Sequence, residues 1–176
     1  MKIIFLAASN SKKSINQQFV KYVASQFDHD EKEILDLNDF SLPLYSVDVE
    51  QESGIPQNAI TFYNKLQDAD GIVISLAEHN GTYTAVFKNL FDWVSRHEVK
   101  MFKNKKLFLV STSPGGRGGQ GVMDAALIRF PIHGAEIIGH FSLPMFQQNF
   151  DDINGILDEP LRLKFEAVLS EVKSKL

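Results

Sequence analysis

Three short segments carry the polar groups that could bind a ligand. Ser9–Asn16 is rich in hydroxyl and amide side chains, Glu78–Gly81 is a polar stretch after an apolar run, and Ser113–Gly121 contains five glycines. Hydroxyls and free backbone amides at the start of a helix bind phosphate, and glycines let the backbone approach a ligand closely. These segments therefore predict a site for a phosphorylated ring compound.

The first segment suits the phosphate. Its polar side chains are those of Ser9, Ser11, Lys12, Lys13, Ser14 and Asn16. A helix is predicted to follow, so donors and the positive end of the helix dipole face the same point. Ordinary helix capping by Ser14, with the other residues solvated, is the alternative. No G-x-x-x-x-G-K-[ST] loop occurs, and no G-x-G-x-x-G follows the first apolar run, which favours a mononucleotide over a dinucleotide.

The second segment can bond the edge of a heteroaromatic ring through the backbone and side chains of Glu78, His79, Asn80 and Gly81. A solvated loop is the alternative, and His79 alone could titrate as a general base near neutral pH. No G-x-S-x-G elbow accompanies it. The histidines stand singly, without the spacing of metal ligands, at His29, His79, His97, His133 and His140. We therefore expect no catalytic side chain and no metal site.

The amino-acid composition excludes several classes of chemistry and of partner. The absence of cysteine excludes disulfides, thiolate catalysis and iron–sulfur clusters, so redox chemistry would need an organic cofactor. A net charge of -4 without a long basic run argues against nucleic acid as a partner. No apolar run is long enough to span a membrane and no signal peptide is recognised, so we expect no membrane partner and a cytoplasmic location. The length predicts a single domain over residues 1–176.

Five apolar runs that alternate with amphipathic segments must position these loops. Strands are predicted at Lys2–Ala8, Glu31–Leu37, Ile72–Leu76, Lys106–Thr112 and Glu136–Leu143. A helix is predicted after each, the last at Pro160–Lys175. This alternation indicates an α/β fold, a three-layer sandwich whose parallel sheet has the order 2-1-3-4-5. The loops after strands one, three and four then converge at one edge, and they are the three polar segments.

Two segments lack periodicity. Asn38–Gln57 contains Pro43, Gly54 and Pro56, and a loop of that length usually covers a ligand or another subunit. Pro144–Asp158 is also predicted to be irregular. On the helix after the third strand, Trp93 is expected in the core or at a subunit interface, and Asp92 and Arg96 are spaced to pair across one turn.

With these motifs in place, the chain resembles the NADPH-dependent FMN reductases, a flavodoxin-like family that includes quinone, azo-dye and chromate reductases. The resemblance covers nearly the whole length. It rests on Ala8-Ser9 with Ser14-Ile15-Asn16, Ala69–Ile74, Glu78–Gly81, Lys88–Arg96 and Ser111–Gly116. It implies a flavodoxin-like fold with bound FMN.

The resemblance also implies residue roles. Ser9, Ser14 and Asn16 would hold the FMN phosphate, with Ser11, Lys12 and Ile15 in the same loop. Glu78, His79, Asn80 and Gly81 would contact the flavin ring and ribityl chain, and Ser113, Gly115 and Gly116 would approach the ring from the other loop. The chain departs from the family pattern at Ser11, where an arginine is usual, at Ala77 for a proline and at His79 for a tyrosine.

In mechanism, the resemblance implies that NAD(P)H gives a hydride to FMN, leaves, and is replaced by a quinone, flavin, azo compound or similar small acceptor at the same ring face. The cofactor carries the chemistry, so no acid–base residue is required. The Asn38–Gln57 loop and Tyr83 would border that face in a homodimer or homotetramer. Two alternatives are a flavodoxin-type electron carrier with little NAD(P)H activity and a flavin-free binding module on the same fold. FMN uptake and the response of the bound flavin to NADPH discriminate among the three.

Overall fold

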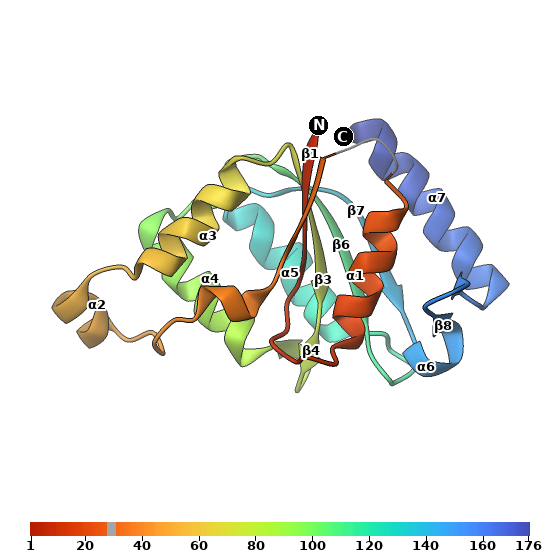
Figure 1. Ribbon diagram of the computed structural model, residues 1–176, viewed down its shortest axis with the longest axis horizontal. Coiled ribbons are helices and arrows are strands. Elements are labelled where there is room, and N and C mark those ends of the chain that lie inside the picture. Colours follow the sequence, from red (N-terminus) through yellow and green to blue (C-terminus); the bar gives the residue numbers. More distant parts are fainter. Residues whose placement is uncertain (28–30) are drawn as a thin grey trace.

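Five parallel strands form the centre of the computed structural model, which describes residues 1–27 and 31–176 (Figure 1). They are β1 (Lys2–Ala7), β2 (Glu31–Leu35), β3 (Gly71–Leu76), β6 (Lys106–Thr112) and β7 (Glu136–Leu143). Their order in the sheet is β2-β1-β3-β6-β7. The predicted order 2-1-3-4-5 is therefore confirmed, because the other short strands lie outside this sheet.

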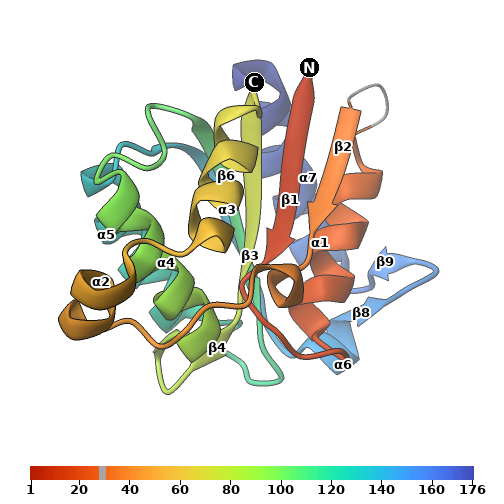
Figure 2. The same cartoon turned by 60° about the vertical axis from the view of Figure 1, so that its left-hand side comes forward.

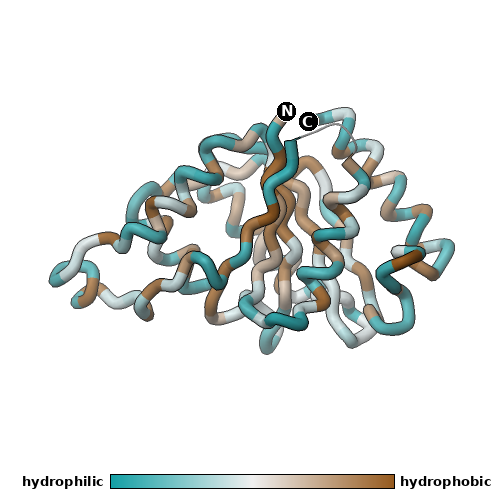
Figure 3. Tube along the Cα trace, viewed as in Figure 1, coloured by the Kyte–Doolittle hydropathy of each residue, from teal (hydrophilic) through white to brown (hydrophobic). Residues whose placement is uncertain are grey.

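Helices cover both faces of the sheet. One face is packed by α1 (Ile15–Ser25) and α7 (Glu159–Lys175), and the other by α3 (Gln57–Gln67), α4 (Ala85–His97) and α5 (Gln120–Ile132) (Figure 1). Side chains of a strand alternate between the faces, so Ile3 and Phe5 of β1 join one core and Ile4 and Leu6 join the other. Figure 3 shows the resulting concentration of hydrophobic residues along the strands.

The segment expected to be an irregular loop from Asn38 to Gln57 is partly helical, which corrects the prediction. Leu37–Phe40 forms a short 3-10 turn, η1, and Val47–Ser53 forms the helix α2. Asp36 caps η1, so the second strand ends at Leu35. No residue of α2 is buried. A helix without a buried face needs no apolar repeat, and its sequence therefore shows no helical period.

Helix α2 projects away from the body of the molecule, at the left of Figure 1 and again in Figure 2. We call the segment 41–54 the arm. Its base is fixed to α4: Trp93 Nε1 donates to the Pro43 carbonyl at 2.8 Å, and Asn89 Oδ1 accepts from the Tyr45 amide at 2.8 Å. Trp93 is fully buried, as the sequence predicted for a core position.

The predicted pair between Asp92 and Arg96 is wrong. Asp92 accepts from Lys88, one turn earlier on α4, at 2.7 Å. Arg96 instead meets Glu50 of the arm, with an Nε to Oε2 distance of 2.9 Å. Sequence spacing on one helix could not reveal Glu50, because the folded chain brings it from 46 residues away.

The segment 144–158 contains more regular structure than predicted. It holds the short helix α6 (Phe146–Asn149) and a small hairpin of β8 (Phe150–Asp151) and β9 (Gly155–Ile156). None of the helices in the described ranges, 1–27 and 31–176, is long and apolar enough to cross a lipid bilayer.

Candidate functional site

The three predicted segments meet in one hollow at the carboxyl ends of β1, β3 and β6. The hollow has a volume of about 270 Å³ and is lined by Ser9, Ser11, Lys13, Ser14, Ile15, Asn16, Ala77, Glu78, His79, Thr112, Ser113 and Pro114. It lies beside the point where the strand order reverses, which is where open α/β sheets bind ligands. The predicted site residues outside this lining are exposed beside it: Lys12, Asn80, Gly81, Gly115 and Gly116.

The first segment presents free donors at the start of α1. Ser14 is the N-cap, and its Oγ accepts from the Gln17 amide at 3.3 Å. Within the described chain no hydrogen bond occupies the backbone amides of Ile15 and Asn16. These amides and the helix dipole favour an anion at this end of the hollow. The capping alternative and the phosphate role are thus compatible, because the Ser14 cap leaves both amides unpaired.

The Asn16 side chain fastens the hollow from inside the protein. Its Oδ1 accepts from Ser75 Oγ at 2.9 Å and from the Thr112 amide at 3.2 Å, while its Nδ2 donates to the Thr112 carbonyl at 3.1 Å. The residue is 3% exposed. These three hydrogen bonds, which we call the Asn16 clamp, join α1 to the carboxyl ends of β3 and β6.

Ser11 stands at the position where the resembled family usually has an arginine. Lys13, two residues further along the chain, lines the hollow with its positive charge. The neighbouring Lys12 is exposed and is not part of the lining. The sequence offered both lysines, and only the turn of the loop determines which one faces the hollow.

The second segment is part of a β-hairpin, which was not predicted from the sequence. Glu78–His79 (β4) pairs antiparallel with Thr82–Tyr83 (β5). Asn80 and Gly81 form the two-residue turn, with φ of 52° and 79°. Positive φ at both central residues is the signature of a type I′ turn, and the Asn-Gly dipeptide is its strongest sequence signal. That dipeptide could have revealed the hairpin.

Glu78 reaches from the hairpin to helix α5. Its Oε2 accepts from the Val122 amide in the first turn of α5 at 2.9 Å. The carboxylate therefore lies at the positive end of a helix dipole. The sequence placed Glu78 at the site and gave no sign of this partner, which is 44 residues further along the chain.

The third segment packs tightly at one end and lies open at the other. A Cβ on Gly118 would come within 2.9 Å of the Leu143 carbonyl carbon, and Ser111 Oγ donates to the Gly118 carbonyl at 2.8 Å. A Cβ on Gly116 would meet nothing within 4 Å. The glycines thus serve two purposes: Gly118 permits close packing on β7, and Gly116 leaves bare backbone at the surface.

Tyr83 does not line the hollow, which corrects the prediction that it borders the open face of the ligand. Its ring stacks on Phe130 of α5 at a centroid distance of 6.0 Å. Its hydroxyl is buried and has no hydrogen-bond partner among the described residues. Burial raises the pKa of Tyr83 to about 12.

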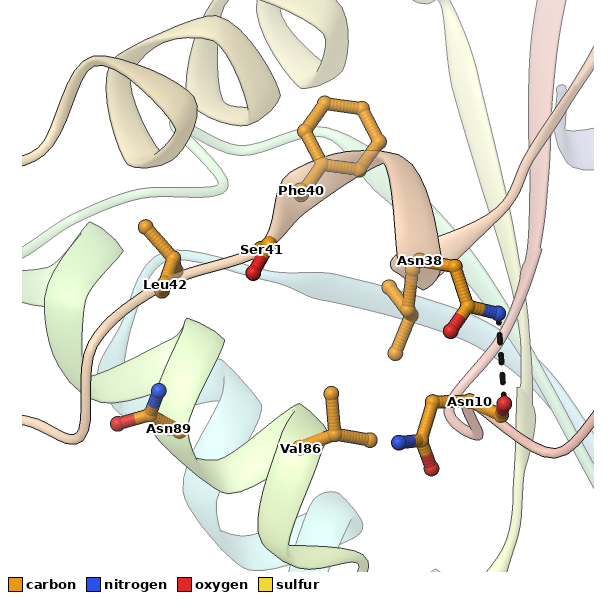
Figure 4. A pocket seen from close by; sticks show the side chains of 8 residues that line it. Asn10, Asn38, Phe40, Ser41, Leu42, Val86 and Asn89 are labelled. Atoms are coloured by element: carbon orange, nitrogen blue, oxygen red, sulfur yellow. Dashed lines mark hydrogen bonds between the residues drawn. The ribbon is translucent and has the colours of Figure 1, made fainter.

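A second, smaller hollow of about 160 Å³ lies on the other side of the first loop, between η1 and α4 (Figure 4). It is lined by Asn10, Leu37, Asn38, Phe40, Ser41, Leu42, Val86 and Asn89. Asn38 Nδ2 donates to the Asn10 carbonyl at 3.3 Å and so ties η1 to the first loop. The start of the segment 38–57 therefore borders this second hollow, whereas α2 projects away from it.

No group of His, Cys, Asp and Glu side chains in the described parts of the chain could hold a metal ion. His29 lies outside the described residues. His79 is exposed on the hairpin, His97 contacts Tyr63, and His133 Nδ1 lies 2.7 Å from the Val99 carbonyl oxygen.

A doubly wound sheet with unpaired helix-start amides after its first strand and a hollow at its switch point is typical of mononucleotide-binding α/β proteins. Within that class, the family model for NADPH-dependent FMN reductase matches residues 1–148. The chain belongs to this family, and it is an enzyme of the NAD(P)H-dependent FMN reductase type, with FMN as cofactor.

Two proteins similar in sequence to this chain are named as quinone reductases. The chain is 35% identical over 44% of its length to quinone reductase of Escherichia coli strain K12, and the match covers 42% of that protein. It is 32% identical over 67% of its length to 2-hydroxy-1,4-benzoquinone reductase of Burkholderia sp., covering 63% of it. The chain thus spans less than two thirds of either relative.

Among solved structures, the chain resembles FerB, the flavoenzyme NAD(P)H:(acceptor) oxidoreductase of Paracoccus denitrificans. The TM-score is 0.73, with 98% of this chain and 97% of that chain covered. The sequence identity is 19%, so this likeness shows the flavodoxin-like fold alone.

The residues of the hollow fit FMN. Hydroxyls, two unpaired amides and Lys13 gather at the α1 end, where no carboxylate lines the wall. Glu78, the one acidic residue of the lining, lies on the hairpin at the other end, and its carboxylate is bonded to α5. A donor-rich, cation-bearing end suits a phosphate, and bare backbone at Gly116 suits a flat ring.

Proposed function

We propose that this protein is an FMN-dependent NAD(P)H oxidoreductase that passes a hydride from NAD(P)H to a quinone, flavin, azo compound or similar acceptor. The observation that carries the proposal is the hollow at the switch point, because it brings together three polar segments that all lie within the residues matched by the family model. Relatives named as quinone reductases favour a quinone among these acceptors.

The phosphate of FMN would be held at the first segment. The hydroxyls of Ser9, Ser11 and Ser14, the amides of Ile15 and Asn16 and the Lys13 ammonium supply the donors, with Lys12 further out in solvent. Charge-assisted hydrogen bonds of this kind are about twice as strong as neutral ones.

The ring and ribityl chain would be held by the hairpin and the glycine-rich loop. The hairpin contributes Glu78, His79, Asn80 and Gly81, and the loop contributes Ser113, Gly115 and Gly116. The ring system supplies hydride acceptance and donation when FMN is bound. The protein then has to bind, orient and expose the ring, and none of its side chains needs to act as acid or base.

Small substrates reach the hollow from solvent. Ser11, Lys13 and His79 are exposed at its rim, and no described segment closes over it. His79 is placed to contact a ligand at the edge of the hollow. In such a site NAD(P)H and the electron acceptor bind one after the other at the same open face.

We further propose a homodimer or homotetramer in which the arm contacts a second copy. Leu44 is 81% exposed and Val47 is 56% exposed, and both belong to the arm. Asn89, Trp93 and Arg96 of α4 fix the base of the arm, so these apolar side chains are presented in one place. One FMN-binding unit over residues 1–176 and a cytoplasmic location stay predictions.

Initial rates test the proposal. Purified protein loaded with FMN should oxidise NADPH or NADH when a benzoquinone is added. Double-reciprocal plots at several quinone concentrations should be parallel, as a ping-pong mechanism at one shared site requires. Intersecting lines would contradict the shared site. Flavin-loaded protein without quinone-dependent turnover would support the electron carrier instead.

A further inference from the structure

Helix α5 begins without a capping side chain of its own. Its N-cap residue is Gly119, which has φ of 82° and offers no side-chain acceptor. The first amides of a helix have no partner within it, so they need one from elsewhere. The partner of the Val122 amide is Glu78 Oε2, at 2.9 Å, from the hairpin. The β4–β5 hairpin thus caps α5.

The hairpin and the first turn of α5 touch at backbone distance. A Cβ on Gly121 would lie 2.8 Å from the Gly81 carbonyl oxygen and 2.9 Å from Glu78 Oε2. Real Cβ atoms essentially never show such contacts. Gly121 therefore permits the approach that the Glu78 carboxylate needs in order to reach Val122. On the other hairpin strand, Tyr83 stacks on Phe130 of the same helix.

The glycine-rich loop leads directly into α5. The position of the first turn of α5 therefore determines where the loop ends. Through the Glu78 to Val122 bond, the second and third segments of the hollow are held at one relative position. We propose that Glu78 is a positioning residue: its carboxylate holds the hairpin on α5 and so sets the spacing of the two segments that face the flavin ring. This inference rests on the proposed function for its effect on FMN.

Substitutions separate positioning from direct contact. Glu78→Ala removes the acceptor, whereas Glu78→Gln keeps an oxygen that can accept from Val122. Gly121→Ala keeps the identity of every residue that we propose to contact the flavin, and it forces the hairpin away from α5. Asp158→Ala is the matched control, because Asp158 caps α7 through the Leu161 amide at 3.0 Å and lies outside the lining of the hollow.

Two readouts decide the inference, and one of them needs no flavin. In the flavin-free protein, hydrogen exchange at the Val122 amide should rise at least about fivefold in Glu78→Ala and Gly121→Ala, the size of a lost cap, and stay near wild type in Glu78→Gln and Asp158→Ala. The FMN dissociation constant, from quenching of flavin fluorescence, should follow the same pattern with a similar factor.

Unchanged Val122 exchange in Glu78→Ala would overturn the inference, and so would a Glu78→Gln variant that weakens FMN as much as Glu78→Ala does. A wild-type protein that binds no FMN would overturn the proposed function, and Val122 exchange would then still decide whether Glu78 holds the hairpin. FMN binding by wild type with no change in Glu78→Ala would overturn this inference alone.

Discussion

At the scale of single residues, charge at the phosphate end depends on one of two neighbouring lysines. The sequence named Lys12 and Lys13 without distinguishing them, and the family position for an arginine holds Ser11. The loop turns Lys13 toward the hollow and leaves Lys12 in solvent. Which side chain faces a ligand is set by the dihedral angles of a loop, and no periodic pattern records them.

Lys13→Ala should weaken FMN binding about tenfold or more, because a charged hydrogen bond to a phosphate contributes about 1.5–3 kcal/mol. The FMN affinity of this variant should also depend less steeply on salt concentration. Titration of flavin fluorescence at two salt concentrations measures both effects. Lys12→Ala is the control and should change affinity less. A larger effect from Lys12 than from Lys13 would refute the assignment.

Tyr83 gives a prediction about stability and pH. A buried hydroxyl without a partner costs about 1–3 kcal/mol, so Tyr83→Phe should raise the free energy of unfolding at pH 7 by about 1 kcal/mol. Tyr45→Phe, which removes a hydroxyl bonded to Glu50 at 3.0 Å, should show no such gain. Urea unfolding of both variants gives the comparison, and a loss of stability in Tyr83→Phe would contradict it.

The raised pKa of Tyr83 fixes the direction of the pH effect. The folded protein keeps the phenol proton up to a pKa of about 12, above the ordinary value of about 10. Titration of Tyr83 therefore leaves the free energy of unfolding unchanged below pH 10. As the pH rises from 10 toward 12 that free energy falls, because the unfolded chain loses the phenol proton first. Wild type should therefore lose more stability than Tyr83→Phe across that window. Parallel losses in the two proteins would speak against burial as the cause.

At the scale of elements, the periodic spacing of apolar residues predicted only those helices and strands that have a buried face. The five long strands and the five covering helices were predictable because each has a buried face. Helix α2 has none, and the hairpin at Glu78–Tyr83 is too short for a pattern. The hairpin could have been read from Asn80-Gly81 alone. The Asn16 clamp could not, because its partners Ser75 and Thr112 come from distant strands.

Asn16→Ala should destabilise the protein, because it leaves the Ser75 hydroxyl and the Thr112 amide and carbonyl buried without their partner. Each unsatisfied group costs about 1–3 kcal/mol, so a total loss of about 2–4 kcal/mol is expected after partial relaxation. FMN affinity should fall as well, since the clamp joins the first and third segments. Chemical unfolding of flavin-free protein measures the first effect.

Gln17→Ala is the control for that experiment. Gln17 is the next residue on α1, and its side chain makes no hydrogen bond within the described chain. Stability close to wild type is expected. An Asn16→Ala protein as stable as Gln17→Ala would show that the clamp contributes little.

At the scale of the whole molecule, the arm is the feature without an explanation inside one chain. It buries no residue of α2, yet α4 holds it in place through Asn89, Trp93 and Arg96. A surface that is both apolar and fixed is typical of protein interfaces. The sequence pointed to a covering role for this segment, but it could not show the direction in which the arm projects.

Leu44→Asp should therefore shift the protein toward monomers, because a charge would be buried against the second copy. Light scattering coupled to size exclusion measures the mass. Ile153→Asp provides the control, since Ile153 is also exposed, at 93%, on the distant β8–β9 hairpin. Equal masses for Leu44→Asp and wild type would exclude the arm as the contact.

FMN binding followed by reduction tests the central claim most directly. Flavin-free protein titrated with FMN should bind it and develop the visible spectrum of a bound flavin, and NADPH or NADH added without oxygen should bleach that spectrum within the time of mixing by hand. A protein that stays colourless after FMN is added and excess flavin is removed would contradict the account. Bound flavin that bleaches only over hours would contradict the reductase and leave the electron carrier.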